Sequence, residues 1–305
     1  MWYNPPEQEV SAVTLHHVTA REGKLLSFLR RELQMSSGLV SRLKFQNAFF
    51  VDGQPAFTDK ILVPGQEITV VIREKRTDEF EPEHLPLDIV YEDEALLAVD
   101  KPAGLVVHPT WNRLTGTLLN RILGYYEETG QDCDIHPVNR LDRDTQGIVL
   151  LAKNSHVHAL LYEMQLAGKF QKTYHALCAG SPPAREGEID LPIRRCEGYT
   201  MLRQVHPEGQ SALTRYRLLE EGDGLCRMEL SPVTGRTHQL RVHCLAMGMP
   251  MLGDPQYFTE SSRCLSEKYG FTGQQLAAVR LCLPHPMTKN LLEIHAFHDI
   301  FLPNG

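Results

Sequence analysis

Four charged side chains lie within five positions of one loop, and their types and spacing could support nucleophilic chemistry. In the stretch VNRLDRDTQGIVLLAKN (138–154) they are Arg140, Asp142, Arg143 and Asp144. A carboxylate beside a guanidinium can act as a nucleophile, because the cation favours the charged form. Gly147 suits a turn, and residues 148–152 form a short apolar run of the kind found in buried strands. We therefore expect the loop at the mouth of a sheet, a common place for catalytic groups.

The residues alone leave other interpretations of this loop open. Its charges could simply pair with one another in a solvated turn. Four of its residues match positions 1, 3, 5 and 6 of a calcium loop, but Lys153 stands at position 12, where the ion needs a bidentate Glu. The loop also nearly matches the D-x-D-x-[TV] pattern of phosphoryl-transfer aspartate loops, but Thr145 falls one place early and Gln146 occupies its position. A hydrolase with Asp142 as nucleophile would need a second carboxylate nearby, and Asp144 is the candidate.

Length and composition set the broad class. With 305 residues the chain can hold one large domain or two unequal ones. No segment approaches the roughly 18 apolar residues of a membrane span, and the polar start MWYNPPEQEV does not resemble a signal peptide. The seven cysteines are widely spread without a C-x-x-C pair, which argues against a disulfide framework or a zinc module. We expect a cytoplasmic protein that is not associated with a membrane.

Residues 10–75 have the pattern of a small unit of their own. Apolar residues recur at helical spacing from Leu25 to Leu33, and Ser36 can cap a second helix. Residues 49–51 and 68–72 read as strands, and Asp52-Gly53 between them favours a tight turn. The two helices also carry basic residues, which are Arg30, Arg31, Arg42 and Lys44.

This order of helices, strands and turns resembles the S4 domain, a small RNA-binding module. The chain departs from that pattern at Leu26, where Asp is usual, and at Asn47, where Gly is common. The resemblance implies that the basic helices contact the RNA backbone, which gives affinity more than sequence choice. A net charge of −7 does not exclude such a local basic surface. Residues 76–86 are charged and contain Pro82 and Pro86, so we interpret them as an extended linker.

A second domain is expected over residues 87–305. Strands are predicted at 89–91, 96–99, 172–179, 212–219 and 225–230. Helices are predicted at 116–125, after Asn154, and through Leu240, Cys244 and Met247, whereas residues 185–193 look like a loop. His238 and Arg241 lie three positions apart and should therefore share a helix face that differs from this apolar stripe.

Four stretches of the second domain resemble the RluA-type pseudouridine synthases. They are KPAGLVVHP, NRLDRDTQGIVLLAKN, KTYHALCAG and TGRTHQLRVHCLAMGMPMLGDPQY, in the order in which that family has them. The resemblance covers most of residues 87–290, and an S4 domain in front of this domain is also a family arrangement. It implies an α+β fold with a mixed, largely antiparallel sheet and flanking helices. It also implies that the protein isomerises uridine to pseudouridine in RNA without a cofactor or a metal.

The resemblance assigns roles to individual residues. Asp142 would be the nucleophile, attacking either the base or the ribose, and Arg241 would keep it ionised. Tyr174 would lie against the uracil, where its phenol could take the C5 proton. Arg140 would fill the space that the flipped nucleotide leaves in the RNA. The remaining candidates for phosphate or loop contacts are Lys101, Arg143, Arg236 and His238.

Three positions depart from the family pattern and bear on substrate range. Asn139 replaces a His, Gln146 replaces a Ser, and Leu276-Ala277-Ala278 stands for a late L-H-A motif. The favoured RNA is the large-subunit ribosomal RNA on which S4-bearing relatives mostly act, and transfer RNA is second. The alternative is an RNA-binding assembly protein of the same fold that has lost catalysis, and the three departures are its support.

Overall fold

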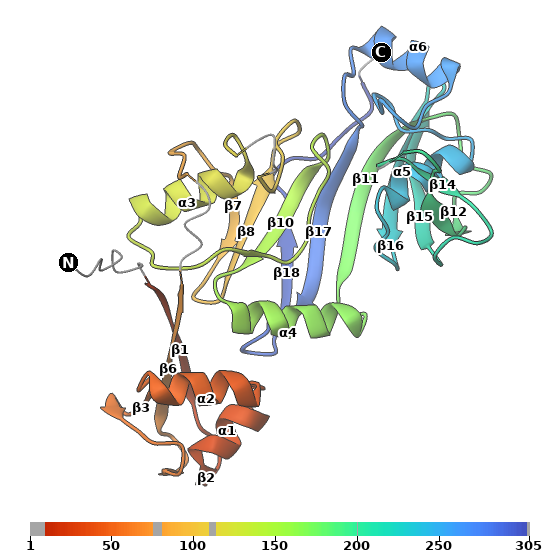
Figure 1. The fold of residues 1–305 in the computed structure, drawn as a ribbon. Coiled ribbons are helices and arrows are strands. Elements are labelled where there is room, and N and C mark those ends of the chain that lie inside the picture. The colour runs from red at the N-terminus through yellow and green to blue at the C-terminus, as the bar shows by residue number, and fades with distance from the viewer. Residues whose placement is uncertain (1–9, 76–80, 110–113, 200, 304–305) are drawn as a thin grey trace.

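The computed structural model describes residues 10–75, 81–109, 114–199 and 201–303, which form a small N-terminal unit and a large second unit (Figure 1). The small unit has a four-stranded sheet in the order β1-β6-β3-β4, a two-stranded ribbon β2-β5, and two helices. Its elements are β1 (Val10–Val18), β2 (Gly23–Lys24), α1 (Leu25–Arg31), α2 (Ser37–Phe45), β3 (Phe49–Val51), β4 (Gln54–Pro55), β5 (Ile61–Leu62) and β6 (Glu67–Lys75). Ser36 caps α2 as predicted, since its side chain accepts a hydrogen bond from Leu39 N.

The large unit is built on a ten-stranded sheet. Its strands follow the order β12-β15-β16-β11-β17-β10-β8-β7, with β18 paired to β17 and β9 paired to β10. The bounds are β7 (Ile89–Glu92), β8 (Leu96–Lys101), β9 (His136–Pro137), β10 (Gln146–Ala152), β11 (Gln171–Ala179), β12 (Glu186–Asp190), β15 (Leu213–Gly222), β16 (Leu225–Pro232), β17 (Leu276–Pro284) and β18 (Leu291–His295). Only the β10–β17 pair is parallel among these described strands. The predicted mixed, largely antiparallel sheet is confirmed.

Helices cover both faces of the sheet at β8 and β10. Val149 and Leu151 pack with α3 (Leu118–Glu128), whereas Ile148 and Leu150 pack with α4 (Ser155–Leu166). Successive strand residues point to opposite faces, so a strand buried on both sides needs an unbroken apolar run. This explains why residues 148–152 contain no polar side chain. Figure 1 shows α3 and α4 on opposite sides of these strands.

A row of four residues runs across the centre of the sheet. Lys101 of β8 pairs with Gly147 of β10, Gly147 pairs with Ala278 of β17, and Ala278 pairs with Tyr174 of β11. Gly147 has φ +106°, and a Cβ there would collide with the backbone of Ala278. The row therefore needs a residue without a side chain at 147. It places Tyr174 two strands away from Gly147 of β10, the strand that follows the Asp142 loop.

Two features of the large unit differ from the sequence-based expectation. Residues 185–193 were expected to be a loop, which is wrong, because Glu186–Asp190 forms the edge strand β12 paired with β15. The sequence there mixes Glu, Gly and Asp with a single buried Ile189, so it lacks the apolar enrichment of an interior strand. Helix α6 (Glu260–Tyr269) was not predicted. No helix in the described ranges is long and apolar enough to cross a membrane.

The second half of the predicted linker lies along α3. Residues 76–80 of the linker fall outside the described ranges, whereas 81–86 are described without regular structure. The backbone N–H of Glu83 donates to Asn120 O at 2.8 Å, and Asn120 Nδ2 donates to Glu81 O at 2.7 Å. This part of the chain is therefore held on the large unit.

Candidate active site

The loop that carries Asp142 is fixed at both ends by hydrogen bonds. Asn139 bonds to the adjoining strand twice, since its Nδ2 donates to Ile148 O and its Oδ1 accepts from Leu150 N, at 3.1 and 2.8 Å. Thr145 N donates to Asp142 O at 3.2 Å and closes a turn around the loop. The departure at 139 thus has a clear structural function, because the amide supplies both a donor and an acceptor to the strand.

Lys101 lies beneath the loop, and its side chain is fully buried. Its ammonium group donates to three backbone carbonyls, those of Pro102, Leu105 and Arg143, at 2.8–2.9 Å. Burial lowers the pKa of Lys101 to about 8, against the opposing charges of Asp144, Asp142 and Asp100. Lys101 was predicted to contact RNA, but the structure directs its charge inward, where it joins the turn after β8 to the Asp142 loop.

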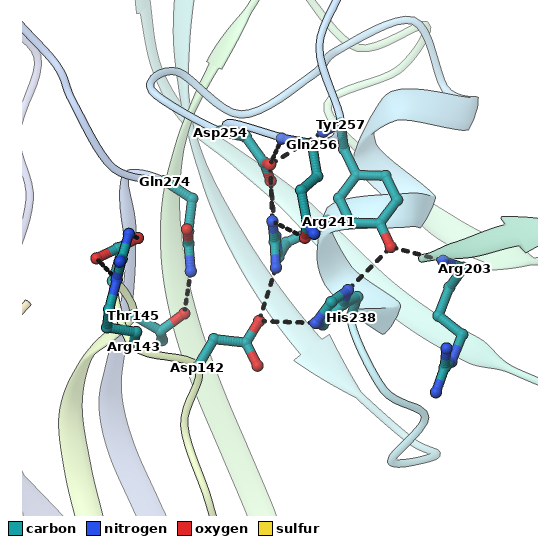
Figure 2. A network of polar contacts seen from close by, with 11 residues as sticks. Asp142, Arg143, Thr145, Arg203, His238, Arg241, Asp254, Gln256, Tyr257 and Gln274 are labelled. Carbon is teal, nitrogen blue, oxygen red and sulfur yellow. Dashed lines mark hydrogen bonds and ion pairs between the residues drawn. The ribbon is translucent and has the colours of Figure 1, made fainter. Parts of the chain in front are cut away.

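Helix α5 (Gln239–Ala246) brings Arg241 to the same place. Arg241 Nη1 donates to Asp142 Oδ2 at 3.0 Å, while its Nε and Nη2 donate to the two carboxylate oxygens of Asp254 at 2.7 Å each (Figure 2). Nη2 also donates to Gln256 Oε1, and the guanidinium lies 4.8 Å from the ring centroid of Tyr257. Burial opposes the charge, but Asp254 and then Asp142 outweigh it and raise the pKa of Arg241. The buried guanidinium is therefore a fixed cation between two carboxylates.

His238 stands immediately before α5 and faces Asp142. Its Nε2 lies 3.8 Å from Asp142 Oδ2, and its Nδ1 is 2.9 Å from Tyr257 Oη. The side chain of His238 is 6% exposed, against 36% for that of Asp142. Both His238 and Arg241 face Asp142, but His238 precedes the helix in a left-handed conformation, so the two do not share a helix face as their spacing predicted. The buried ring is, however, turned toward the aspartate rather than toward solvent.

Tyr174 approaches the same region from β11. The pairing of β11 with β17 is irregular between Thr173 and Tyr174, and an irregularity of this kind changes the direction of a side chain. Burial, and then the negative charge of Asp142, raise the pKa of Tyr174 to about 12. Asp142 and Arg241 are thus in direct contact, and Tyr174, from a third segment, is near enough to Asp142 for that charge to act on its phenol.

The remaining predicted RNA-contacting residues lie on the surface. Arg140, Arg143 and Arg236 are exposed near the Asp142 loop and the start of α5. Arg143 pairs with Asp144 through two hydrogen bonds of 2.9 and 2.8 Å. Asp144 is therefore engaged with a cation, which does not favour its use as the acid of a hydrolase. The four basic residues predicted to contact RNA in the small unit are also exposed; they are Arg30, Arg31, Arg42 and Lys44.

Three residues that hold Arg241 were not singled out from the sequence. Asp254, Gln256 and Tyr257 lie in the stretch GDPQY, which follows α5. The side chain of Asp254 is fully buried, and its Oδ1 also accepts hydrogen bonds from the backbone N–H groups of Gln256 and Tyr257. The only indication in the sequence was that Asp254 is an acidic residue among apolar and small neighbours, and nothing there identified Arg241 as its partner. The described residues contain no group of three or more His, Cys, Asp or Glu that could hold a metal.

Comparison with known proteins identifies the family. Residues 95–246 match the family described as RNA pseudouridylate synthase. The uncharacterized RNA pseudouridine synthase YhcT of Bacillus subtilis is 32% identical over 274 residues, which cover 89% of this chain and 88% of that protein. Ribosomal large subunit pseudouridine synthase D of Pasteurella multocida is 35% identical over 267 residues, covering 84% and 82%. The solved structure of human RNA pseudouridylate synthase domain containing 1 matches with a TM-score of 0.59 at 28% identity, over 71% of this chain and 86% of that one.

These relatives are matched over most of their own length. The fold, with its mixed sheet and flanking helices, agrees with that of the human structure. The chain therefore belongs to the RNA pseudouridine synthase family, as its RluA-type motifs indicated, and it is an enzyme that isomerises uridine in RNA to pseudouridine.

Proposed function

We propose that the enzyme modifies uridine in large-subunit ribosomal RNA and that Asp142 is its nucleophile. The observation that supports the nucleophile best is the 3.0 Å contact between Asp142 and the buried guanidinium of Arg241. The choice of RNA is supported by relatives such as the ribosomal large subunit pseudouridine synthase D of Pasteurella multocida. Transfer RNA is the second candidate.

The reaction breaks the N1–C1′ bond, turns the uracil and rejoins it to the ribose through C5. A single carboxylate can form the transient bond to the nucleotide, and the charged form is the reactive one. Arg241 stabilises that form by direct pairing, and Asp254 holds Arg241 through two hydrogen bonds. The side chain of Asp142 is 36% exposed and therefore accessible to a nucleotide that has left its stack.

The phenol of Tyr174 is proposed to take the C5 proton in the last step. Tyr174→Phe should therefore lower the single-turnover rate by about 10²- to 10⁴-fold, the usual contribution of acid–base catalysis. Its raised pKa, about 12, means that the phenolate fraction grows with pH throughout the neutral range. The wild-type rate should accordingly rise between pH 6 and pH 9, and the residual rate of the variant should not.

Single-turnover assays of pseudouridine formation at several pH values test this role. The affinity of both proteins for the same RNA is the control, because loss of the hydroxyl should leave it unchanged. A variant within about threefold of the wild-type rate would show that Tyr174 only packs against the base.

The small unit is proposed to be an S4-like domain that binds the RNA backbone. Arg30, Arg31, Arg42 and Lys44 are exposed on its two helices, whereas the apolar residues of these helices, such as Leu25, Leu29 and Leu43, lie in its core. In the large unit, Arg140, Arg143 and Arg236 are exposed close to Asp142 and are proposed to contact RNA around the target nucleotide. Arg140 is proposed to occupy the space that the flipped nucleotide leaves.

Mapping pseudouridines in total RNA from strains with and without the gene tests the choice of RNA. We expect at least one position in large-subunit ribosomal RNA to remain uridine in the strain without the gene and to be restored by the wild-type protein. Loss confined to transfer RNA would overturn the ribosomal assignment. If every pseudouridine persisted in all RNA classes, and the purified protein modified none of them, the catalytically silent alternative would hold.

A further inference from the structure

The two oxygens of the Asp142 carboxylate have different surroundings. Oδ2 accepts a hydrogen bond from Arg241 Nη1 at 3.0 Å and also faces His238 Nε2 at 3.8 Å. Oδ1 accepts no hydrogen bond from any residue in the parts of the chain that the structure describes. The guanidinium of Arg241 and the imidazole of His238 thus both approach the same edge of the Asp142 carboxylate (Figure 2).

The backbone holds His238 in an uncommon conformation. His238 has φ +56° and ψ +20°, the left-handed region, which costs a non-glycine residue free energy. Gln239, which is buried, fixes the adjoining turn, because its Oε1 accepts from Arg236 N and its Nε2 donates to Leu213 O. Strain of this kind persists where surrounding contacts determine the position and is common at functional sites.

Tyr257 determines which ring nitrogen of His238 carries the proton. Its hydroxyl oxygen accepts a hydrogen bond from Arg203 N at 2.8 Å and lies 2.9 Å from His238 Nδ1. Burial raises the pKa of Tyr257, so the phenol stays protonated and its O–H donates a hydrogen bond to Nδ1. When the ring is neutral, the proton therefore resides on Nε2 and points at Asp142.

The charged groups around His238 come from four segments. Asp142 and Asp254 favour a charged imidazole, whereas Arg241 and Arg203 oppose it, and burial, the largest influence, lowers the pKa of His238. The ring therefore acts as a neutral N–H donor. A buried neutral ring directed at a carboxylate is poorly suited to bind a phosphate of the RNA backbone, the contact predicted from sequence.

We propose that His238 is a positioning residue that, together with Arg241, holds the Oδ2 edge of Asp142 and leaves Oδ1 to face the uridine. The 3.8 Å separation suits this role, since catalytic hydrogen bonds are often long in a free enzyme and shorten in the complex. The inference rests on the proposed role of Asp142. It extends that role by assigning separate tasks to the two oxygens.

A matched pair of variants tests the Nε2 donor. The side-chain amide of Gln can place an N–H near the Nε2 position, whereas that of Asn reaches only the Nδ1 position. His238→Gln should keep the single-turnover rate within about tenfold of wild type, and His238→Asn should lower it roughly 10- to 100-fold. RNA affinity should change by less than about twofold in both. A purely structural role predicts the opposite order, because Asn tolerates the left-handed backbone better.

The rates are measured on total RNA from a strain without the gene, and the affinities on an in vitro transcript of large-subunit ribosomal RNA. Tyr257→Phe is a third variant. It keeps the ring over Arg241 but frees the imidazole to change tautomer, so a three- to tenfold slower rate is expected. Equal rates for the Gln and Asn variants, or weakened binding at an unchanged rate, would overturn the inference. Wild-type protein that forms no pseudouridine would instead overturn the proposed function.

Discussion

Asp142→Asn should abolish pseudouridine formation while leaving RNA binding intact. The amide has the same size as the carboxylate but lacks a nucleophilic oxygen, so we expect the single-turnover rate to fall by more than about 10⁴-fold, as in other enzymes that lose their nucleophile. Asp142 is half-buried on a loop that is held by Asn139, Lys101 and the turn to Thr145. The substitution should therefore not disturb the fold. Pseudouridine formation and RNA affinity are measured separately on the same preparation.

Asp144→Asn is the matched control from the same loop. Asp144 is two positions away and is paired with Arg143 rather than with Arg241. We expect its substitution to leave the rate within about tenfold of wild type. A large loss at 144 together with a small loss at 142 would indicate that Asp144 is the essential carboxylate. Equal large losses would revive the hydrolase-like interpretation, in which two carboxylates act together.

Sequence reasoning predicted the secondary elements of the catalytic unit where their periodicity was strong. The run 148–152 has the expected form because both faces of the sheet are covered there, and Val157, Leu161 and Met164 form the face of α4 that packs on the sheet. The strand Glu186–Asp190 escaped prediction because it is an edge strand with a single buried side chain. Whether this segment forms a strand depends on its pairing with β15, and the local sequence does not reveal that pairing.

The meeting of Asp142 and Arg241, which are 99 positions apart, could be expected only from the family resemblance. No local pattern links a loop before β10 to a helix after β16. The contacts that hold Arg241 were missed for the same reason, because the role of Asp254 can be recognised only once its pairing with Arg241 is known. Lys101 and His238 were recognised as functional candidates, but the sequence did not show that their polar atoms point inward.

Arg241 is the second position at which a large effect is expected, and the effect should extend to stability. Arg241→Lys retains a positive charge but supplies one nitrogen atom where three nitrogens now bind Asp142, Asp254 and Gln256. A lysine cannot reproduce this geometry. We expect the single-turnover rate to fall by about 10²- to 10³-fold, comparable to the loss of a preorganised electrostatic contact. The free energy of unfolding should fall by about 1–3 kcal/mol, because the fully buried carboxylate of Asp254 keeps a cation nearby but loses its bidentate hydrogen bonds.

The double variant Arg241→Met with Asp254→Asn separates the two effects. It removes both buried charges, while the amide oxygen at 254 can still accept from the backbone N–H groups of Gln256 and Tyr257. Replacing both partners of a buried ion pair is far less destabilising than removing one, so much of the lost stability should return. The activity should not return, because no cation then faces Asp142. If the double variant recovered both stability and rate, the guanidinium would be only a structural support and the carboxylate at 142 would not depend on it.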